Sequence, residues 1–193
     1  AIPPQLPMCP RRWPVHCETD LRSSEHNRLY YPMSEPYDAQ FYAATHHGNE
    51  GDIEFYATLC EGAQSVLELG CGSGRVLSAV VPPLATGLGV DLHEGLLALA
   101  RDRTRDPHHT PPISYQRGDM RTLDLGRRFD RVLIPYSGLF CLGEPAGLRA
   151  CLAVAAAHLA PDGLFAVDAY AADGFHHLAS QEDMGRLDEW TEL

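Results

Sequence analysis

Val66-Leu67-Glu68-Leu69-Gly70-Cys71-Gly72-Ser73-Gly74-Arg75 is the stretch of the sequence that decides the fold. It begins within a short apolar run, residues 65–69, which predicts a strand buried in a parallel sheet. The three glycines that follow permit a tight turn and a close approach of a ligand to the backbone. We predict that a helix, residues 75–81, follows this loop directly. Free N–H groups and the helix dipole then favour a carboxylate or a phosphate at this point.

Strand and helix patterns alternate along most of the chain. The predicted strands are residues 65–69, 87–92, 113–116, 129–134 and 164–168. The predicted helices are residues 37–45, 52–60 (with Asp52 as N-cap), 75–81, 94–103 and 145–159. Pro161-Asp162-Gly163 predicts a turn before the last strand. This alternation predicts an α/β fold, a doubly wound and mostly parallel sheet with helices on both faces.

The 193 residues suffice for one sizeable domain and are too few for two. Residues 1–36 are rich in Pro, Arg and polar residues without a sustained period, and we expect them to form an N-terminal arm. Residues 37–193 then form the α/β domain. The chain stops soon after the fifth predicted strand, although residues 185–193 are a candidate start for a sixth.

Composition narrows the class of protein. The formal net charge of −11 argues against a nucleic-acid partner, because neutralising phosphates needs clustered Lys and Arg. No apolar run reaches the length of a membrane span, and no signal peptide is evident, so we expect no membrane partner. Six cysteines without a C-x-x-C pair favour a cytoplasmic location. Three His-His pairs lack metal-ligand spacing, and we expect no metal site.

Candidate site residues follow successive predicted strands. In a doubly wound sheet, ligands bind outside the carboxyl ends of the strands, where the strand order reverses. Asp91 ends the second strand, where an acid can accept both hydroxyls of a ribose. Asp119 and Met120 follow the third, and a carboxylate beside an apolar side chain suits an adenine. Pro135-Tyr136-Ser137 follows the fourth, where reacting atoms are expected.

Each of these features has a structural alternative. Asp91 and Glu94 also resemble a capping box at the start of a helix. Asp119 is a common type of turn residue. Tyr136 can be a half-buried aromatic at the end of a strand. The joint position of these residues after successive strands favours the binding interpretation.

The sequence resembles the class I S-adenosylmethionine (SAM) dependent methyltransferases over roughly residues 37–170. Residues 66–75 are similar to the first motif of that family, Gly89-Val90-Asp91 to the second and Gly118-Asp119-Met120 to the third. Residues 129–134 resemble its fourth strand, and residues 159–165 resemble the lead into its fifth. The resemblance implies a Rossmann-like fold of seven strands. We expect its last two strands, an antiparallel hairpin, to be missing or incomplete here.

The resemblance also implies SAM as the cofactor and a role for each matching residue. Glu68 would order the glycine loop and lie near the amino group of SAM. Asp91 would bind the ribose. The remaining cofactor-binding candidates are Tyr37 in a helix that closes over the cofactor in many relatives, Gly70, Cys71, Gly72 and Gly74 around the methionine part, Leu92, Asp119 and Met120 around the adenine, and Pro135 near the reacting atoms. Packing is an equal alternative for Phe41, on the same helix as Tyr37. Arg75 either reaches the methionine carboxylate or is an exposed first-turn arginine.

Tyr136 is the first candidate for a catalytic base, because of its place after the fourth strand. The further candidates are His46, His47, His176 and His177. We interpret Cys71 as a small packing residue of the loop and not as a nucleophile. An amine acceptor needs a base only late in the reaction, whereas a hydroxyl needs a poised one.

The sequence therefore predicts methyl transfer from SAM to the N, O or C atom of a small molecule. One alternative is a SAM-binding subunit without activity of its own. Another is an NAD(P)-dependent oxidoreductase, but its Gly-x-Gly-x-x-Gly motif requires glycine where Arg75 stands. The oligomeric state stays open.

Overall fold

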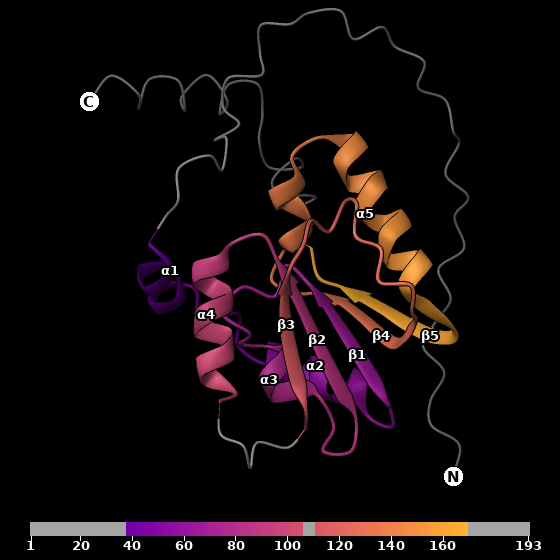
Figure 1. The fold of residues 1–193 in the computed structure, drawn as a ribbon, viewed down its shortest axis with the longest axis horizontal. Coiled ribbons are helices and arrows are strands. Elements are labelled where there is room, and N and C mark those ends of the chain that lie inside the picture. The colour runs from indigo at the N-terminus through magenta and orange to yellow at the C-terminus, as the bar shows by residue number, and fades with distance from the viewer. Residues whose placement is uncertain (1–37, 106–110, 170–193) are drawn as a thin grey trace, which may run out of the picture. The chain divides into compact units, whose positions relative to one another are not determined.

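The structure of the chain is a computed structural model, and it describes residues 38–105 and 111–169 (Figure 1). The predicted arm of residues 1–36, Tyr37, and the candidate sixth strand at residues 185–193 lie outside the described residues. Within the described ranges, no helix has the length and apolar character that crossing a bilayer requires.

Five parallel strands form the sheet, in the order β3-β2-β1-β4-β5. They are β1 (Ser65–Leu69), β2 (Thr86–Asp91), β3 (Ile113–Arg117), β4 (Phe129–Ile134) and β5 (Leu159–Val167). The chain runs outward from β1 through β2 to β3 and then returns to the other side of β1 as β4. The strand order thus reverses between β1 and β4, which is where ligands bind in sheets of this kind.

Helices cover both faces of the sheet (Figure 1). The helices are α1 (Ala39–Thr45), α2 (Asp52–Cys60), α3 (Leu77–Val80), α4 (Glu94–Arg103) and α5 (Pro145–His158), with a short 3-10 helix η1 (Gly138–Leu142) before α5. Side chains of α2, α3 and α4 form one core with the sheet, whereas α5 and residues 120–125 cover the other face. The predicted doubly wound α/β fold is confirmed.

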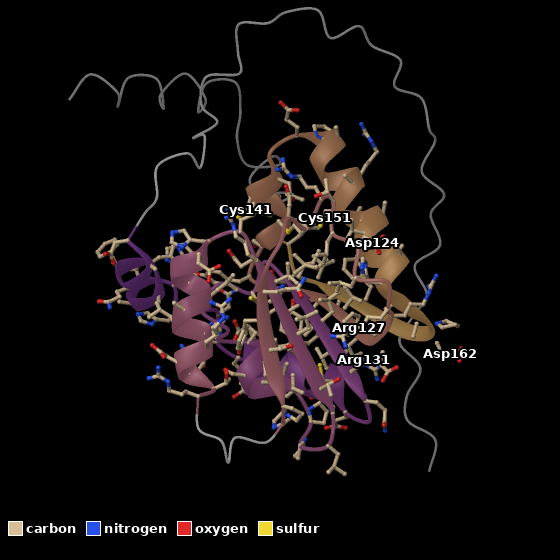
Figure 2. All side chains as sticks on the ribbon, viewed as in Figure 1. Asp124, Arg127, Arg131, Cys141, Cys151 and Asp162 are labelled. Carbon is tan, nitrogen blue, oxygen red and sulfur yellow. The ribbon has the colours of Figure 1, made fainter. Side chains whose placement is uncertain are left out.

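Each face of the sheet has its own apolar core, because residues alternate between the faces along a strand. In β1, Val66 belongs to the core under α2, α3 and α4, and Leu67 to the core under α5. Cys151 of α5 is fully buried in the second core, and Figure 2 shows it on the side of α5 that faces the sheet. Both cores are continuous with the strands, which makes the sheet a rigid support for its loops.

Two expectations about the helices are wrong. The helix after the glycine loop was expected at residues 75–81, but α3 spans only Leu77–Val80. Residues 71–76 make turns first, with Gly74 N–H donating to the Cys71 carbonyl at 2.9 Å. Asp52 is not the N-cap of α2 either, since Gly51 takes that position with φ +80°. The Asp52 carboxylate instead accepts the N–H of Asn49 and binds Arg75.

The fifth strand begins earlier than residue 164. Its register with β4 pairs Phe129 with Leu159 and Arg131 with Leu164, so two steps along β4 match five along β5. The additional residues form a bulge, and they contain the predicted Pro161-Asp162-Gly163 turn. The turn therefore lies inside the strand and not before it.

Candidate active site

In the glycine loop after β1, every second residue is a glycine, and these glycines are the residues with positive φ. Gly70, Gly72 and Gly74 have φ values of +75°, +53° and +70°, a region that other residues adopt only with strain. The intervening residues thus need no unusual conformation. Gly74 has a second reason to be glycine, because an added Cβ would lie 2.6 Å from the hydroxyl oxygen of Tyr115.

Hydrogen bonds within the protein order this loop. The N–H groups of Gly70 and Cys71 donate to the Val90 carbonyl at 2.8 and 3.0 Å, and the Gly72 N–H donates to the Asp91 carboxylate. We expected free N–H groups at the start of a helix to favour an anion here. For Gly70, Cys71 and Gly72 this expectation is wrong, because their N–H groups already form hydrogen bonds within the protein. The loop presents a fixed backbone surface at the end of β1 instead.

Glu68, the fourth residue of β1, is 2% exposed. Its Oε2 is a buried atom without a hydrogen-bond partner. Burial raises the pKa of Glu68 to about 8, against the lowering effects of the Leu77 N–H and the Arg75 charge. A buried polar atom without a hydrogen-bond partner is costly, so this carboxyl suits a site that receives a polar group or a cation from a ligand.

Asp91 at the end of β2 accepts two backbone hydrogen bonds. Its Oδ2 accepts the Gly72 N–H and its Oδ1 accepts the His93 N–H, each at 2.8 Å. The capping-box alternative is wrong, because the N-cap of α4 is His93, whose Nδ1 accepts the Leu96 N–H. Each oxygen of Asp91 retains a second acceptor position, so the carboxylate can still bind hydroxyl groups.

Asp119 makes an ion pair that the sequence interpretation missed. Arg121 donates to it from Nη2 at 2.6 Å and from Nε at 2.9 Å, and its backbone N–H adds a bond at 2.8 Å. These bonds hold the pKa of Asp119 below its usual range. Asp119 is therefore a turn residue in this structure, and its predicted bond to an adenine remains a prediction.

Three other cofactor-binding candidates lie around the same loop. The Met120 sulfur lies 3.8 Å from a Cβ built on Gly70, so the third motif does come near the first. Leu92 is 53% exposed after β2. Cys71 is buried, and burial raises the pKa of its thiol, which agrees with its interpretation as a packing residue.

Arg75 neither projects into solvent nor keeps its guanidinium for a ligand. Its Nη1 and Nη2 bind the two carboxylate oxygens of Asp52 at 3.0 and 2.6 Å. The guanidinium also lies 5.8 Å from the centre of the Tyr136 ring. A Cβ on Gly48 would overlap it, so Gly48 gives it room. Arg75 thereby joins the loop after β1 to the start of α2.

Pro135 is buried at the end of β4, and Tyr136 after it is 37% exposed. Tyr136 and Ser137 have φ values of +55° and +56°. Both of their N–H groups donate to the carboxylate of Asp168 after β5, that of Tyr136 at 2.7 Å. Our sequence interpretation did not single out Asp168. The rule that selected Asp91, an acid at the carboxyl end of a strand, would also have found it.

The residue after helix α1, His46, lies beside Tyr136. The His46 ring stacks on Tyr42 with centres 3.7 Å apart and meets the Tyr136 ring edge-on at 6.2 Å. The structure thus brings together two of the predicted base candidates. His47 is exposed, whereas His176 and His177 lie outside the described residues. Phe41 is 71% exposed, which rules out core packing for it.

The two ends of the sheet differ in the residues that lie there. Figure 2 shows Cys141, on η1 after β4, far from Arg131, which lies near the start of that strand. Arg131 donates to the carbonyls of Leu59 and Glu61, an arrangement that only ties α2 to the sheet. Among the described residues, no group of three or more His, Cys, Asp or Glu is arranged to hold a metal ion. Asp91, Met120 and Tyr136 lie at or after the carboxyl ends of β2, β3 and β4, at the opposite end of the sheet from Arg131.

Known proteins are similar to this chain in sequence and in fold. The family model described as "Methyltransferase domain" matches residues 66–163. The chain is 38% identical over 108 residues to dTDP-3-amino-3,6-dideoxy-alpha-D-glucopyranose N,N-dimethyltransferase of Streptomyces fradiae, covering 55% of this chain and 39% of that protein. It is 33% identical over 106 residues to dTDP-3-amino-3,4,6-trideoxy-alpha-D-glucopyranose N,N-dimethyltransferase of Streptomyces venezuelae, covering 55% and 42%.

The fold resembles that of a solved amino pentose methyltransferase from Micromonospora echinaspora with SAM bound. The TM-score is 0.56 and the identity 29%, over 76% of this chain and 59% of that one. The chain spans less than half the length of the two curated relatives named above. The family model nevertheless covers half of the chain, including the glycine loop, Asp91 and Tyr136. The chain belongs to the SAM-dependent methyltransferases of Rossmann-like fold.

Proposed function

We propose that this chain binds SAM at the carboxyl ends of β1 and β2 and directs methyl transfer to the amino nitrogen of a small amino sugar. The observation that carries the cofactor site is Glu68 Oε2, a buried carboxyl oxygen without a hydrogen-bond partner next to the glycine loop. SAM has an ammonium group in its methionine part, which supplies a partner and favours the ionised form of this carboxyl. The residues present therefore fit this cofactor.

Within this proposal, Glu68 binds the amino group, and the backbone of Gly70, Cys71, Gly72 and Gly74 borders the methionine part. Asp91 binds the ribose hydroxyls with the acceptor positions that Gly72 and His93 leave open. Leu92 and Met120 border the adenine. For Asp119 to accept the adenine amine as well, the incoming group must share the carboxylate with Arg121.

When bound, SAM supplies a methyl group on a sulfonium, a good electrophile. The task of the protein is then alignment and the exclusion of water, which can account for much of the rate. Pro135 and Tyr136 follow β4, and the Tyr136 ring meets the His46 ring edge-on, so we assign the acceptor to this side. An amine loses its proton only late, so His46, as a neutral imidazole, can receive it without special activation. The Tyr136 hydroxyl can accept a hydrogen bond from the amine but would take up its proton only as a phenolate.

The amino-sugar acceptor rests on the two curated relatives, both of which are named as N,N-dimethyltransferases of dTDP-amino sugars. We also propose that the protein acts in the cytoplasm, on the cysteine pattern of the sequence. An oligomeric partner is not part of the proposal.

The first test is titration calorimetry with S-adenosylhomocysteine, with NADH as the comparison ligand. Micromolar binding of S-adenosylhomocysteine without binding of NADH supports the cofactor site, and the opposite result refutes it. The second test incubates the chain with SAM and dTDP-3-amino-3,6-dideoxy-α-D-glucopyranose and measures methylated product by mass spectrometry, with dTDP-glucose as the control acceptor. Binding without turnover on any amino-sugar nucleotide would favour a SAM-binding subunit without activity of its own.

A further inference from the structure

Asp168 is the point at which three segments of the described chain meet. Its Oδ2 accepts the Tyr136 N–H at 2.7 Å and the Tyr56 hydroxyl at 3.1 Å, and its Oδ1 accepts the Ser137 N–H. The carboxylate thus connects the end of β5 to the turn after β4 and to the middle of α2. Burial and the charge of Asp168 raise the pKa of Tyr56, so this hydroxyl remains a donor.

The turn that Asp168 binds is strained. Tyr136 and Ser137 are the non-glycine residues with positive φ among residues 38–105 and 111–169. A side chain disfavours this left-handed conformation, which persists only where the surroundings enforce it. In this conformation the neighbouring N–H groups of Tyr136 and Ser137 both donate to the carboxylate of Asp168. The hydrogen bonds and the strain therefore occur in the same two residues.

The conformation of this turn decides where the Tyr136 side chain lies. The Arg75 guanidinium lies over its ring, 5.8 Å from the ring centre, and the His46 ring meets it edge-on with centres 6.2 Å apart. If the backbone at Tyr136 returned to an ordinary conformation, the Cα–Cβ bond would point elsewhere and both contacts would be lost. The Asp168 carboxylate, directly after β5, therefore controls an aromatic side chain on the acceptor side of the proposed site.

We propose that Asp168 is a positioning residue for methyl transfer: by binding the N–H groups of Tyr136 and Ser137, it holds the turn that places the Tyr136 ring beside the acceptor. The proposal rests on the function proposed above for the acceptor, but its structural part does not depend on it. Asp168 itself touches neither the cofactor nor the reacting atoms in this scheme.

The central variant is Asp168→Asn, which keeps the size of the side chain but loses the charge and presents an NH₂ group to one of the two N–H donors. Tyr56→Phe is the matched control, since it removes the third bond to Asp168 and leaves both bonds to the turn. The rescue variant adds Ser137→Gly to Asp168→Asn, because glycine adopts a positive φ without strain. All variants are made in the full chain.

Three readouts separate positioning from general stability. Amide hydrogen exchange at Tyr136 and Ser137, measured by NMR, reports the turn itself. Calorimetry with S-adenosylhomocysteine reports the cofactor site. Initial rates with the dTDP-amino sugar give kcat and the KM for each substrate.

For Asp168→Asn we expect amide exchange at Tyr136 and Ser137 to accelerate by about tenfold or more. This factor corresponds to the loss of one charge-assisted hydrogen bond. S-adenosylhomocysteine affinity should change by less than about threefold and kcat should fall by about tenfold or more. Ser137→Gly should restore part of kcat, and Tyr56→Phe should leave exchange at both amides slow. Unchanged exchange, unchanged kcat, or absence of rescue overturns the proposal. If the wild-type chain transfers no methyl group to any acceptor, the proposed function fails, and the exchange data still decide whether Asp168 holds the turn.

Discussion

The backbone N–H of Gly72 donates a 2.8 Å hydrogen bond to the Asp91 carboxylate, and this bond joins the glycine loop after β1 to the end of β2. Two motifs that lie 19 residues apart in the sequence thus form one unit before any ligand arrives. Since Asp91 is also the proposed ribose ligand, one carboxylate orders the surface for the methionine part and binds the next part of the cofactor.

Asp91→Ala should weaken S-adenosylhomocysteine binding by about 10- to 100-fold, because bonds to a charged acceptor contribute about 1.5–3 kcal/mol. Asp91→Asn should lose less, since its remaining oxygen can still accept one N–H. Titration calorimetry measures both. Asp124→Ala is a suitable control: Asp124 accepts the Gly126 N–H at 3.0 Å in the exposed loop before β4, where it is labelled in Figure 2. An equal loss in this control would contradict the prediction.

Gly74→Ala should destabilise the protein more than Gly72→Ala. Both positions have positive φ, which costs roughly 1–2 kcal/mol for alanine. At Gly74 the new Cβ would also lie 2.6 Å from the Tyr115 hydroxyl oxygen, whereas at Gly72 its nearest neighbour is a Leu96 methyl at 3.8 Å. Urea denaturation measures the difference. Equal losses would mean that Tyr115 moves aside without cost.

Asp52 and Arg75 should prove energetically coupled. Their side chains are 10% and 23% exposed and share two hydrogen bonds. We expect each single alanine variant to lower the free energy of unfolding by about 1.5–3 kcal/mol, and the double variant to lose less than the sum. The exposed pair of Arg101 and Glu94, whose side chains are 45% and 59% exposed, is the control, and its coupling should be below about 1 kcal/mol.

Glu68 should make the protein less stable as the pH rises. Burial raises its pKa from 4.5 to about 8 in the folded state, so the native protein holds a proton that the unfolded chain releases. The free energy of unfolding then falls as the pH rises from about 4.5 to about 8, and the slope ends above that range.

Glu68→Gln should remove this slope, since glutamine does not titrate, and should be more stable than wild type at pH 8. Urea denaturation at a series of pH values tests it. Glu54→Gln removes an exposed carboxylate from α2 and serves as the matched control. If both variants retain the wild-type slope, the slope comes from other groups.

His158 should be required for the contact between α5 and the loop before β4. It is 3% exposed; its Nε2 accepts the Leu125 N–H at 2.9 Å, and its Nδ1 lies 2.8 Å from the Val154 carbonyl. His158→Phe leaves the Leu125 N–H without an acceptor, at a cost of about 1–3 kcal/mol in urea denaturation. His158→Gln, which offers both an acceptor and a donor, should lose less, and equal losses would contradict this explanation.

The sequence predicted the central part of the fold well because burial and periodicity dominate there. The strands at residues 65–69 and 129–134 and the helices at residues 52–60 and 94–103 have the predicted bounds. Each is an apolar or amphipathic run with a clear boundary. The helix after the glycine loop proved shorter because three positive φ values leave the chain in turns up to Val76, which no periodicity reveals.

Partners of charged side chains were harder to predict than their positions. The sequence placed Asp91 and Asp119 at the ends of β2 and β3, but which groups they bind depends on local geometry. Arg121 reaches Asp119 because a turn brings two near neighbours together. Asp52 and Arg75 lie 23 positions apart, and only the packing of α2 against the loop shows that they meet.

The strand order described above also affects how the chain folds during synthesis. The central strand, β1, pairs with β2 soon after it is made, but its other neighbour is β4, and hydrogen bonds between Ser65 and Asp130 span 65 residues. Such distant pairing makes folding slow, because a long loop must close before any contact rewards it. Until residue 134 has left the ribosome, β1 has an unpaired, apolar edge. Chaperone binding and aggregation of the nascent chain should therefore be greatest between the synthesis of β2 and that of β4.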